Sequence, residues 1–202
     1  QFVPDNGDGV AQNNRATALN STVSGGTGST ASGLNSTVGG GVENFASGIS
    51  ATIGGGYQNL NSSQDSVIAG GHRNTNTAFV ASVGGGQYNL AGGTASTVGG
   101  GFKNNATAVN ATIAGGAENV NQGITASIGG GYKNVASGLE STIAGGSLNQ
   151  ATVDQATVGG GVDNRATGFH AVISGGHTNK ATAINSTVSG GYGNIASGVG
   201  SS

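Results

Sequence analysis

A strict 15-residue repeat constrains this 202-residue chain more than any other feature. A valine or isoleucine stands two residues before each of twelve Gly-Gly pairs, and every gap between these residues is 15. An asparagine recurs in the same frame from Asn14 to Asn194, with Ser29 as its exception. Because no insertion interrupts the period, each unit can stack on an identical neighbour. The apolar positions are Val23, Val38, Ile53, Ile68, Val83, Val98, Ile113, Ile128, Ile143, Val158, Ile173 and Val188.

The unit length and its residue types predict an all-β fold. Fifteen residues are too few for the helical units of known repeat families. The unit is also rich in Gly, Thr, Val and Ile and poor in Leu, Glu and Lys, which disfavours helix. We therefore predict a parallel β-solenoid of about 13 coils over residues 14–202, with two or three short strands per coil and a length of roughly 60 Å. Residues 1–13 depart from the pattern, and we interpret them as an N-terminal cap.

Alternation within the unit predicts which side chains face outward. In the segment Ala111-Thr112-Ile113, the first and third residues should point inward and Thr112 outward. The core is then thin, with one valine or isoleucine and two small residues per coil. The Gly-Gly and Asn columns should supply turns because both residue types tolerate positive φ, and stacked Asn side chains should add stability. The outward ladder, a candidate flat binding face, comprises Thr22, Thr37, Thr52, Thr97, Thr112, Thr142, Thr157 and Thr187.

A second column is mostly apolar but is interrupted by Gln64, Thr94 and Asp154. A column that accepts aspartate does not lie deep in a core, so we expect a partly exposed apolar stripe, which often marks an interface. The chain also stops within a unit at Ser202. We therefore predict that the chain self-associates, either side by side or end to end. This prediction depends on the thin core, the apolar stripe and the open end. The candidate stripe comprises Leu19, Leu34, Ile49, Phe79, Val109, Ile124, Leu139, Phe169 and Ile184.

Composition excludes several other classes. With 43 glycines, one proline and no cysteine, the chain is neither collagen-like nor a disulfide scaffold. Six Lys and Arg residues cannot neutralise many phosphates, so we expect no nucleic-acid partner. No apolar stretch approaches the ~18 residues of a spanning helix, so we expect no membrane insertion. An extracellular or cell-surface location is an expectation from the architecture.

The sequence places no catalytic, metal or cofactor group together. His72 and His177 share a column but lie seven coils apart, roughly 34 Å. His170 lies two coils from Glu140, roughly 10 Å, which exceeds hydrogen-bond reach. We therefore predict no catalytic residue, no metal site, no cofactor and no enzymatic activity.

Two further columns carry candidate surface chemistry. N-glycosylation sequons occur at Asn61 and Asn105 and, as candidate sites in one column, at Asn20, Asn35, Asn110 and Asn185; the repeat consensus alone could also create them. The column after Gly-Gly is either a ligand-contacting edge, with Lys103 and Lys133 beside it, or a variable turn position. It contains Val42, Tyr57, His72, Gln87, Phe102, Tyr132, Val162, His177 and Tyr192.

The units from Gly33 to Ser47 and from Gly123 to Ser137 resemble the head repeats of YadA-type trimeric autotransporter adhesins. That resemblance implies a left-handed parallel β-roll in which three chains pack around an axis. It carries over no binding residue. The threonine ladder is similar, more weakly, to the flat faces of β-solenoid antifreeze proteins.

These observations favour a non-enzymatic extracellular structural or adhesive repeat protein that self-associates. Its expected partner is another copy of itself, with a surface or glycan ligand as a further candidate. The alternative is an ice-binding β-solenoid that presents the threonine ladder.

Overall fold

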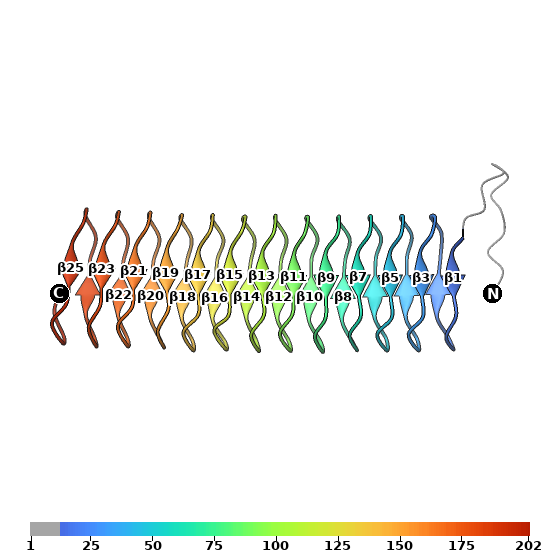
Figure 1. The fold of residues 1–202 in the computed structure, drawn as a ribbon, viewed down its shortest axis with the longest axis horizontal. Helices are drawn as coiled ribbons and strands as arrows, with labels where there is room; N and C mark the ends of the chain where they lie inside the picture. Colours follow the sequence, from blue (N-terminus) through green and yellow to red (C-terminus); the bar gives the residue numbers. More distant parts are fainter. Residues whose placement is uncertain (1–12) are drawn as a thin grey trace.

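The chain forms a straight rod of stacked coils (Figure 1), in a computed structural model that describes residues 13–202. The predicted cap over residues 1–13 therefore lies outside the described residues, apart from Asn13. Residues 13–202 contain no helix. Each coil contributes one two-residue strand to each of two parallel sheets, so the predicted parallel β-solenoid is confirmed.

The odd-numbered sheet has 13 strands, in which each strand pairs with the strand one coil away. Its strands are β1 (Arg15–Ala16), β3 (Thr30–Ala31), β5 (Phe45–Ala46), β7 (Leu60–Asn61), β9 (Thr75–Asn76), β11 (Leu90–Ala91), β13 (Asn105–Ala106), β15 (Val120–Asn121), β17 (Val135–Ala136), β19 (Gln150–Ala151), β21 (Arg165–Ala166), β23 (Lys180–Ala181) and β25 (Ile195–Ala196).

The even-numbered sheet has 12 strands in the same arrangement. Its strands are β2 (Thr22–Val23), β4 (Thr37–Val38), β6 (Thr52–Ile53), β8 (Val67–Ile68), β10 (Ser82–Val83), β12 (Thr97–Val98), β14 (Thr112–Ile113), β16 (Ser127–Ile128), β18 (Thr142–Ile143), β20 (Thr157–Val158), β22 (Val172–Ile173) and β24 (Thr187–Val188).

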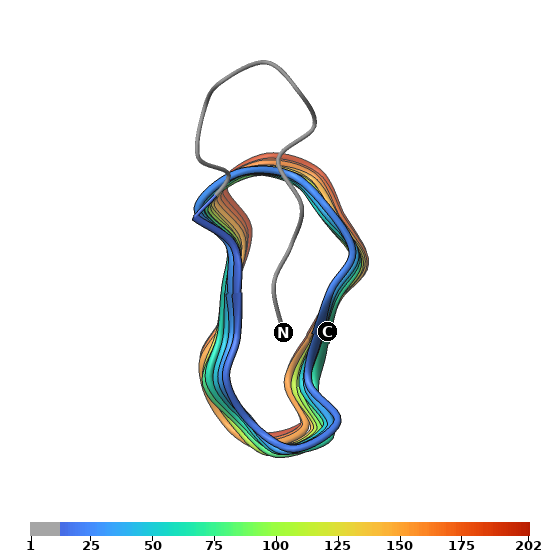
Figure 2. The same cartoon turned by 90° about the vertical axis from the view of Figure 1, so that its right-hand side faces the viewer.

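The coil is flattened in cross-section, with the two sheets on its long sides and turns at its two narrow ends (Figure 2). The first turn runs from the odd to the even sheet, as in residues 107–111, and the second returns through the Gly-Gly pair, as in residues 114–119. A third parallel ladder, of one residue per coil, joins the second turns from Thr27 to Tyr192. The register is 15 residues throughout, so each column of the sequence becomes a line along the rod.

The core contains few bulky side chains, as the alternation predicted. Ala111 and Ile113 are fully buried, while Thr112 between them is exposed. From the odd sheet, small residues such as Ala106 complete the interior. Full burial of one isoleucine contributes about 1.5–3 kcal/mol, so each coil has only one large apolar contribution.

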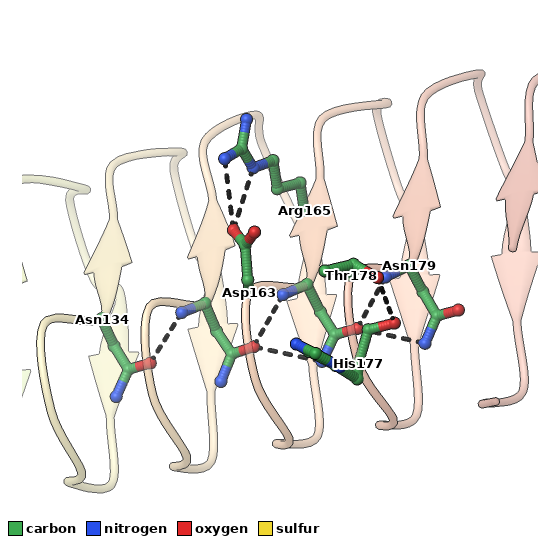
Figure 3. A network of polar contacts seen from close by, with 8 residues as sticks. Asn134, Asp163, Arg165, His177, Thr178 and Asn179 are labelled. Atoms are coloured by element: carbon green, nitrogen blue, oxygen red, sulfur yellow. Dashed lines mark hydrogen bonds and ion pairs between the residues drawn. The ribbon is translucent and has the colours of Figure 1, made fainter. Parts of the chain in front are cut away.

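Buried asparagines form an internal hydrogen-bonded ladder behind the second turn. Asn119 Nδ2 donates to the carbonyl oxygens of Gly115 (3.1 Å) and Gly131 (3.0 Å). Its Oδ1 accepts from the backbone N–H of Asn134 at 2.9 Å. Figure 3 shows the same Oδ1-to-N–H hydrogen bonds from Asn134 to Asn179. The prediction of stacked asparagines is thus confirmed, and the ladder satisfies backbone groups that the turn would otherwise leave buried without partners.

The predicted backbone role of these asparagines is wrong. None of the buried ladder asparagines has positive φ; the residue immediately before each one does, for example Lys103 (φ 53°) before Asn104. A second left-handed position lies in the first turn, for example Asn110 (φ 57°). The prediction holds for the second glycine of each pair, such as Gly116 (φ 85°). The ladder asparagine is required for its amide, because both ends of that group are used.

Candidate interaction surfaces

The rod presents four outer surfaces: two sheet faces and two turn edges. The even sheet presents the predicted threonine ladder, because the first residue of each strand points outward. Neighbouring threonines pair in parallel register, as Thr97 does with Thr112. Valine or serine replaces threonine at four strands: Val67, Ser82, Ser127 and Val172. This face is therefore flat and regular in backbone but mixed in side-chain chemistry.

The first turn presents the predicted apolar stripe, which we call the apolar edge. Its side chains lie at the tip of the turn, beyond the buried small residues. All nine are exposed, from 41% for Leu34, Leu139 and Phe169 to 73% for Leu19. Val199 continues the column. The members are Leu19, Leu34, Ile49, Phe79, Val109, Ile124, Leu139, Phe169, Ile184 and Val199.

The candidate glycosylation column lies beside the apolar edge. Asn20, Asn35, Asn110 and Asn185 are all exposed and all have φ between 55° and 57°. Asparagine is favoured in this left-handed conformation, so the turn itself explains its recurrence, and both readings of the sequons stay open. The sequon at Asn61 is different. Asn61 is fully buried and its Nδ2 donates to the carbonyl oxygens of Thr52 and Ser66, so it cannot accept a glycan in the folded chain.

The second turn presents an edge rich in aromatic side chains, which we call the aromatic edge. It comprises the ladder of single bridged residues from Thr27 to Tyr192 and the left-handed residue that follows each. All four tyrosines of the sequence lie on it. Ring centroids are 5.0 Å apart for Tyr57 and His72, 5.5 Å for His72 and Tyr88, and 6.1 Å for Tyr88 and Phe102. Four successive coils thus carry one run of rings.

Cations lie over the rings of this edge. The Arg73 guanidinium is 5.8 Å from the Tyr88 ring centroid, and Lys103 Nζ is 5.0 Å from that of Phe102. Both distances are within the range of a cation–π contact. Arg73 Nε also donates to Gln58 Oε1 at 2.6 Å, and another nitrogen of the guanidinium to the Tyr88 hydroxyl at 3.1 Å. These contacts fix the guanidinium beside the rings.

Further along the aromatic edge, the cation is paired with an acid. Lys133 Nζ lies 5.0 Å from the Tyr132 ring centroid and 3.4 Å from a Glu118 carboxylate oxygen. The hydrogen bond with Tyr132, and secondarily that with Glu118, raises the pKa of Lys133 above its ordinary value. Lys133 is therefore charged throughout the neutral pH range. On this edge Lys133 is thus paired with an acid, whereas Arg73 and Lys103 form no ion pair among residues 13–202.

The sequence reasoning missed the outer face of the odd sheet. Phe45 and Leu60 are 41% and 37% exposed there, and Leu90, Val120 and Val135 continue their column. The column then changes to Gln150, Arg165 and Lys180. Arg165 donates to the Asp163 carboxylate at 3.2 Å (Figure 3). The sequence does carry a signal for this face: large side chains recur at the position directly after the ladder asparagine. That position varies too much to enter the repeat consensus.

Two of the three histidines contact side-chain amides, and His177 lies against the Tyr192 ring. His72 Nδ1 is 2.6 Å from Gln87 Nε2, while His170 contacts the side-chain oxygens of Gln155 and Asn185. Among residues 13–202, no three potential metal-ligating side chains gather in one place. The same part of the chain contains no helix that could cross a membrane.

One comparison with known proteins gives a match. The ubiquitous surface protein adhesin repeat family matches residues 186–198, which include β24 and β25 and the aromatic-edge turn between them. No curated protein matches the chain. The family match and the repetitive fold together support the class of adhesive or structural repeat proteins. The resemblances to YadA-type heads and to antifreeze proteins stay predictions.

Proposed function

We propose that this chain is a rigid, non-enzymatic rod of a cell surface that associates side by side with copies of itself through the apolar edge. The observation that carries the proposal is the alignment of ten large, exposed apolar side chains along one edge. They lie in runs of up to three successive coils, separated by Gln64, Thr94 and Asp154, and large exposed apolar surfaces often mark interaction sites. The match to an adhesin repeat supports the surface location and the adhesive or structural role.

The regular coil spacing makes such an edge effective. Covering a half-exposed leucine or phenylalanine contributes on the order of 1 kcal/mol, while association costs at least about 4 kcal/mol in lost freedom. One or two such side chains are therefore insufficient. Two rods with the same spacing can place many of them in contact at once, because every coil repeats the geometry.

The experiment is a replacement of the edge with residues that the same column already contains. In the triple variant Ile124→Thr, Leu139→Thr and Phe169→Gln, the new residues have precedents at Thr94 and Gln64. We expect analytical ultracentrifugation to show concentration-dependent oligomers for the parent chain and monomers for the variant. A matched control on the threonine face, Thr112→Ser with Thr142→Ser, should associate like the parent chain. A parent chain that stays monomeric at high concentration would contradict the proposal.

Ice binding is a second candidate because the threonine ladder is outward-facing and in parallel register. Its test is independent of self-association: micromolar protein is assayed for ice-crystal shaping and for slowed recrystallisation. Activity lost in Thr97→Val with Thr112→Val, for which Val67 is the precedent in the column, would establish this function. Inactive parent protein would remove it.

A further inference from the structure

We propose that the aromatic edge between Tyr57 and Lys103 is a binding site for an extended anionic polysaccharide. This inference does not depend on self-association, because the apolar edge lies at the other narrow end of the coil. Two features of these coils point to a sugar ligand with acidic groups: their rings and their charge.

The rings supply contact area for sugars. Tyr57, His72, Tyr88 and Phe102 follow one another along the rod at centroid distances of 5.0–6.1 Å. Tyr57 and Tyr88 are 40% and 38% exposed, so part of each ring faces solvent. Aromatic rings combine an apolar body with polar groups, and a pyranose ring has C–H groups on its faces that can lie against them. Because coils repeat at about 4.8 Å, a linear chain of sugars can follow the edge.

The charge selects acidic sugars. Arg73 and Lys103 form no ion pair among residues 13–202, whereas Lys133 on the same edge is paired with Glu118. No carboxylate is present in this edge from Tyr57 to Lys103; the nearest on the preceding coil is that of Glu43, which accepts from Gln58 Nε2. The Arg73 guanidinium is oriented by Gln58 and Tyr88 and presents a planar fork that matches a carboxylate or sulfate group. The site is thus cationic and unpaired where the rings are densest.

The backbone conformation determines where these side chains lie. Arg73, Tyr88 and Lys103 have φ of 53–57°. Every coil from Glu43 to Thr178 has a non-glycine residue in this conformation, so it does not distinguish these coils from the others. It places two cations and a ring at exposed positions of the edge.

The experiment measures binding of polygalacturonate to the full chain, with dextran as the neutral polymer and a single-stranded oligonucleotide as a polyanion of another class. Two variants use residues that the columns already contain: Arg73→Gln with Lys103→Gln, after Gln58, and Tyr88→Thr with Phe102→Ala, after Thr178 and Ala117. The matched control is Lys180→Gln on the outer face of the odd sheet. Circular dichroism melts confirm that each variant folds.

We expect the parent chain to bind polygalacturonate, and each double variant to bind at least about tenfold more weakly, as expected for loss of charge-assisted hydrogen bonds or of ring contacts. Lys180→Gln should stay within about twofold, since an exposed charge outside the site contributes little. Absence of polygalacturonate binding, equal loss in Lys180→Gln, or equal binding of the oligonucleotide would each overturn the proposal. A monomeric parent chain that still binds polygalacturonate would contradict the proposed self-association alone.

Discussion

The apolar edge and the aromatic edge both connect the two sheets by a turn, but different contacts support the two turns. The first turn reverses the chain over five residues and the second over six, and both use left-handed residues in each coil. At the aromatic edge, a buried asparagine ladder and a constant glycine support the turn from inside. In residues 13–202 the apolar edge has no such side-chain ladder. Local contacts close its turn, such as Ser186 Oγ donating to the Ala183 carbonyl at 2.8 Å, and backbone bonds link neighbouring turns, such as the Asn110 N–H to the Thr94 carbonyl at 2.9 Å. The internally supported edge therefore carries the more varied outer side chains, because its turn does not depend on them.

Alanine substitutions at two adjacent glycines of the aromatic edge test this difference with the largest expected effect. Gly116 has φ 85°, and a Cβ there would lie 2.2 Å from the Gly131 carbonyl oxygen. A Cβ on Gly115 would meet nothing within 4 Å. We expect Gly116→Ala to lower the free energy of unfolding by more than about 4 kcal/mol, since backbone must move. Gly115→Ala should change it by no more than about 1 kcal/mol, as measured by denaturant unfolding. Similar losses in both would show that the constant glycine is not what the turn requires.

The next largest effect should come from the ladder itself. Asn119→Ala removes the partners of the Gly115 carbonyl and of the Asn134 N–H, and one of the two donors to the Gly131 carbonyl, which keeps the Ala117 N–H. Because buried polar groups without partners cost about 1–3 kcal/mol each, we expect a loss of about 3 kcal/mol in thermal or denaturant unfolding. The matched control is Asn110→Ala, an exposed asparagine of the first turn, whose column already contains Ala95 at φ 55°. A larger loss of unfolding free energy in Asn110→Ala than in Asn119→Ala would contradict the proposed role of the ladder.

These two positions also show how far sequence reasoning reached. The 15-residue period fixed the coil, the parallel register and the inward Val/Ile column, because stacking of identical units leaves no other register. It did not distinguish an asparagine that turns the backbone from one that bonds inside it. Asn110 has positive φ while Asn119 does not, and both recur with the same period. Hydrogen-bond geometry decides between those roles, and it depends on the glycine carbonyls of two adjacent coils.

The candidate surfaces were predictable to different degrees. The apolar edge followed from one column that tolerates Asp154, and the structure exposes it as expected. The aromatic edge was seen only as one variable column, because its second row, with Arg73 and Tyr88, lies one residue further along and has no consensus. The two rows become one surface when the left-handed turn places their side chains together. Consensus patterns do not reveal such a surface, since it is built from the positions that vary.

A smaller change in the free energy of unfolding is expected at Val80, a β-branched residue at the left-handed position of the first turn. Val80 has φ 57°, a conformation in which a β-branched side chain is strained. Val80→Asn should raise the free energy of unfolding by about 1 kcal/mol, because asparagine already occupies this column at Asn110. The control Val109→Asn, at an exposed valine without positive φ, should give no such gain. Equal effects of the two changes would indicate that lost apolar surface, not backbone strain, determines the outcome.

The smallest effect tests the outer side chains of the aromatic edge. Because the hydrogen bond with Tyr132 is the leading cause of the raised pKa of Lys133 and Glu118 the lesser one, Tyr132→Val should lower this pKa further than Glu118→Gln. The titration can be followed by NMR at the lysine side chain. A raised pKa in the folded chain means that any stabilisation is present below the ordinary lysine value and is lost only as pH rises through the folded value. We therefore expect stability to be unchanged across neutral pH in all three chains, which follows if the internal ladder, and not the exposed pair, supports this edge.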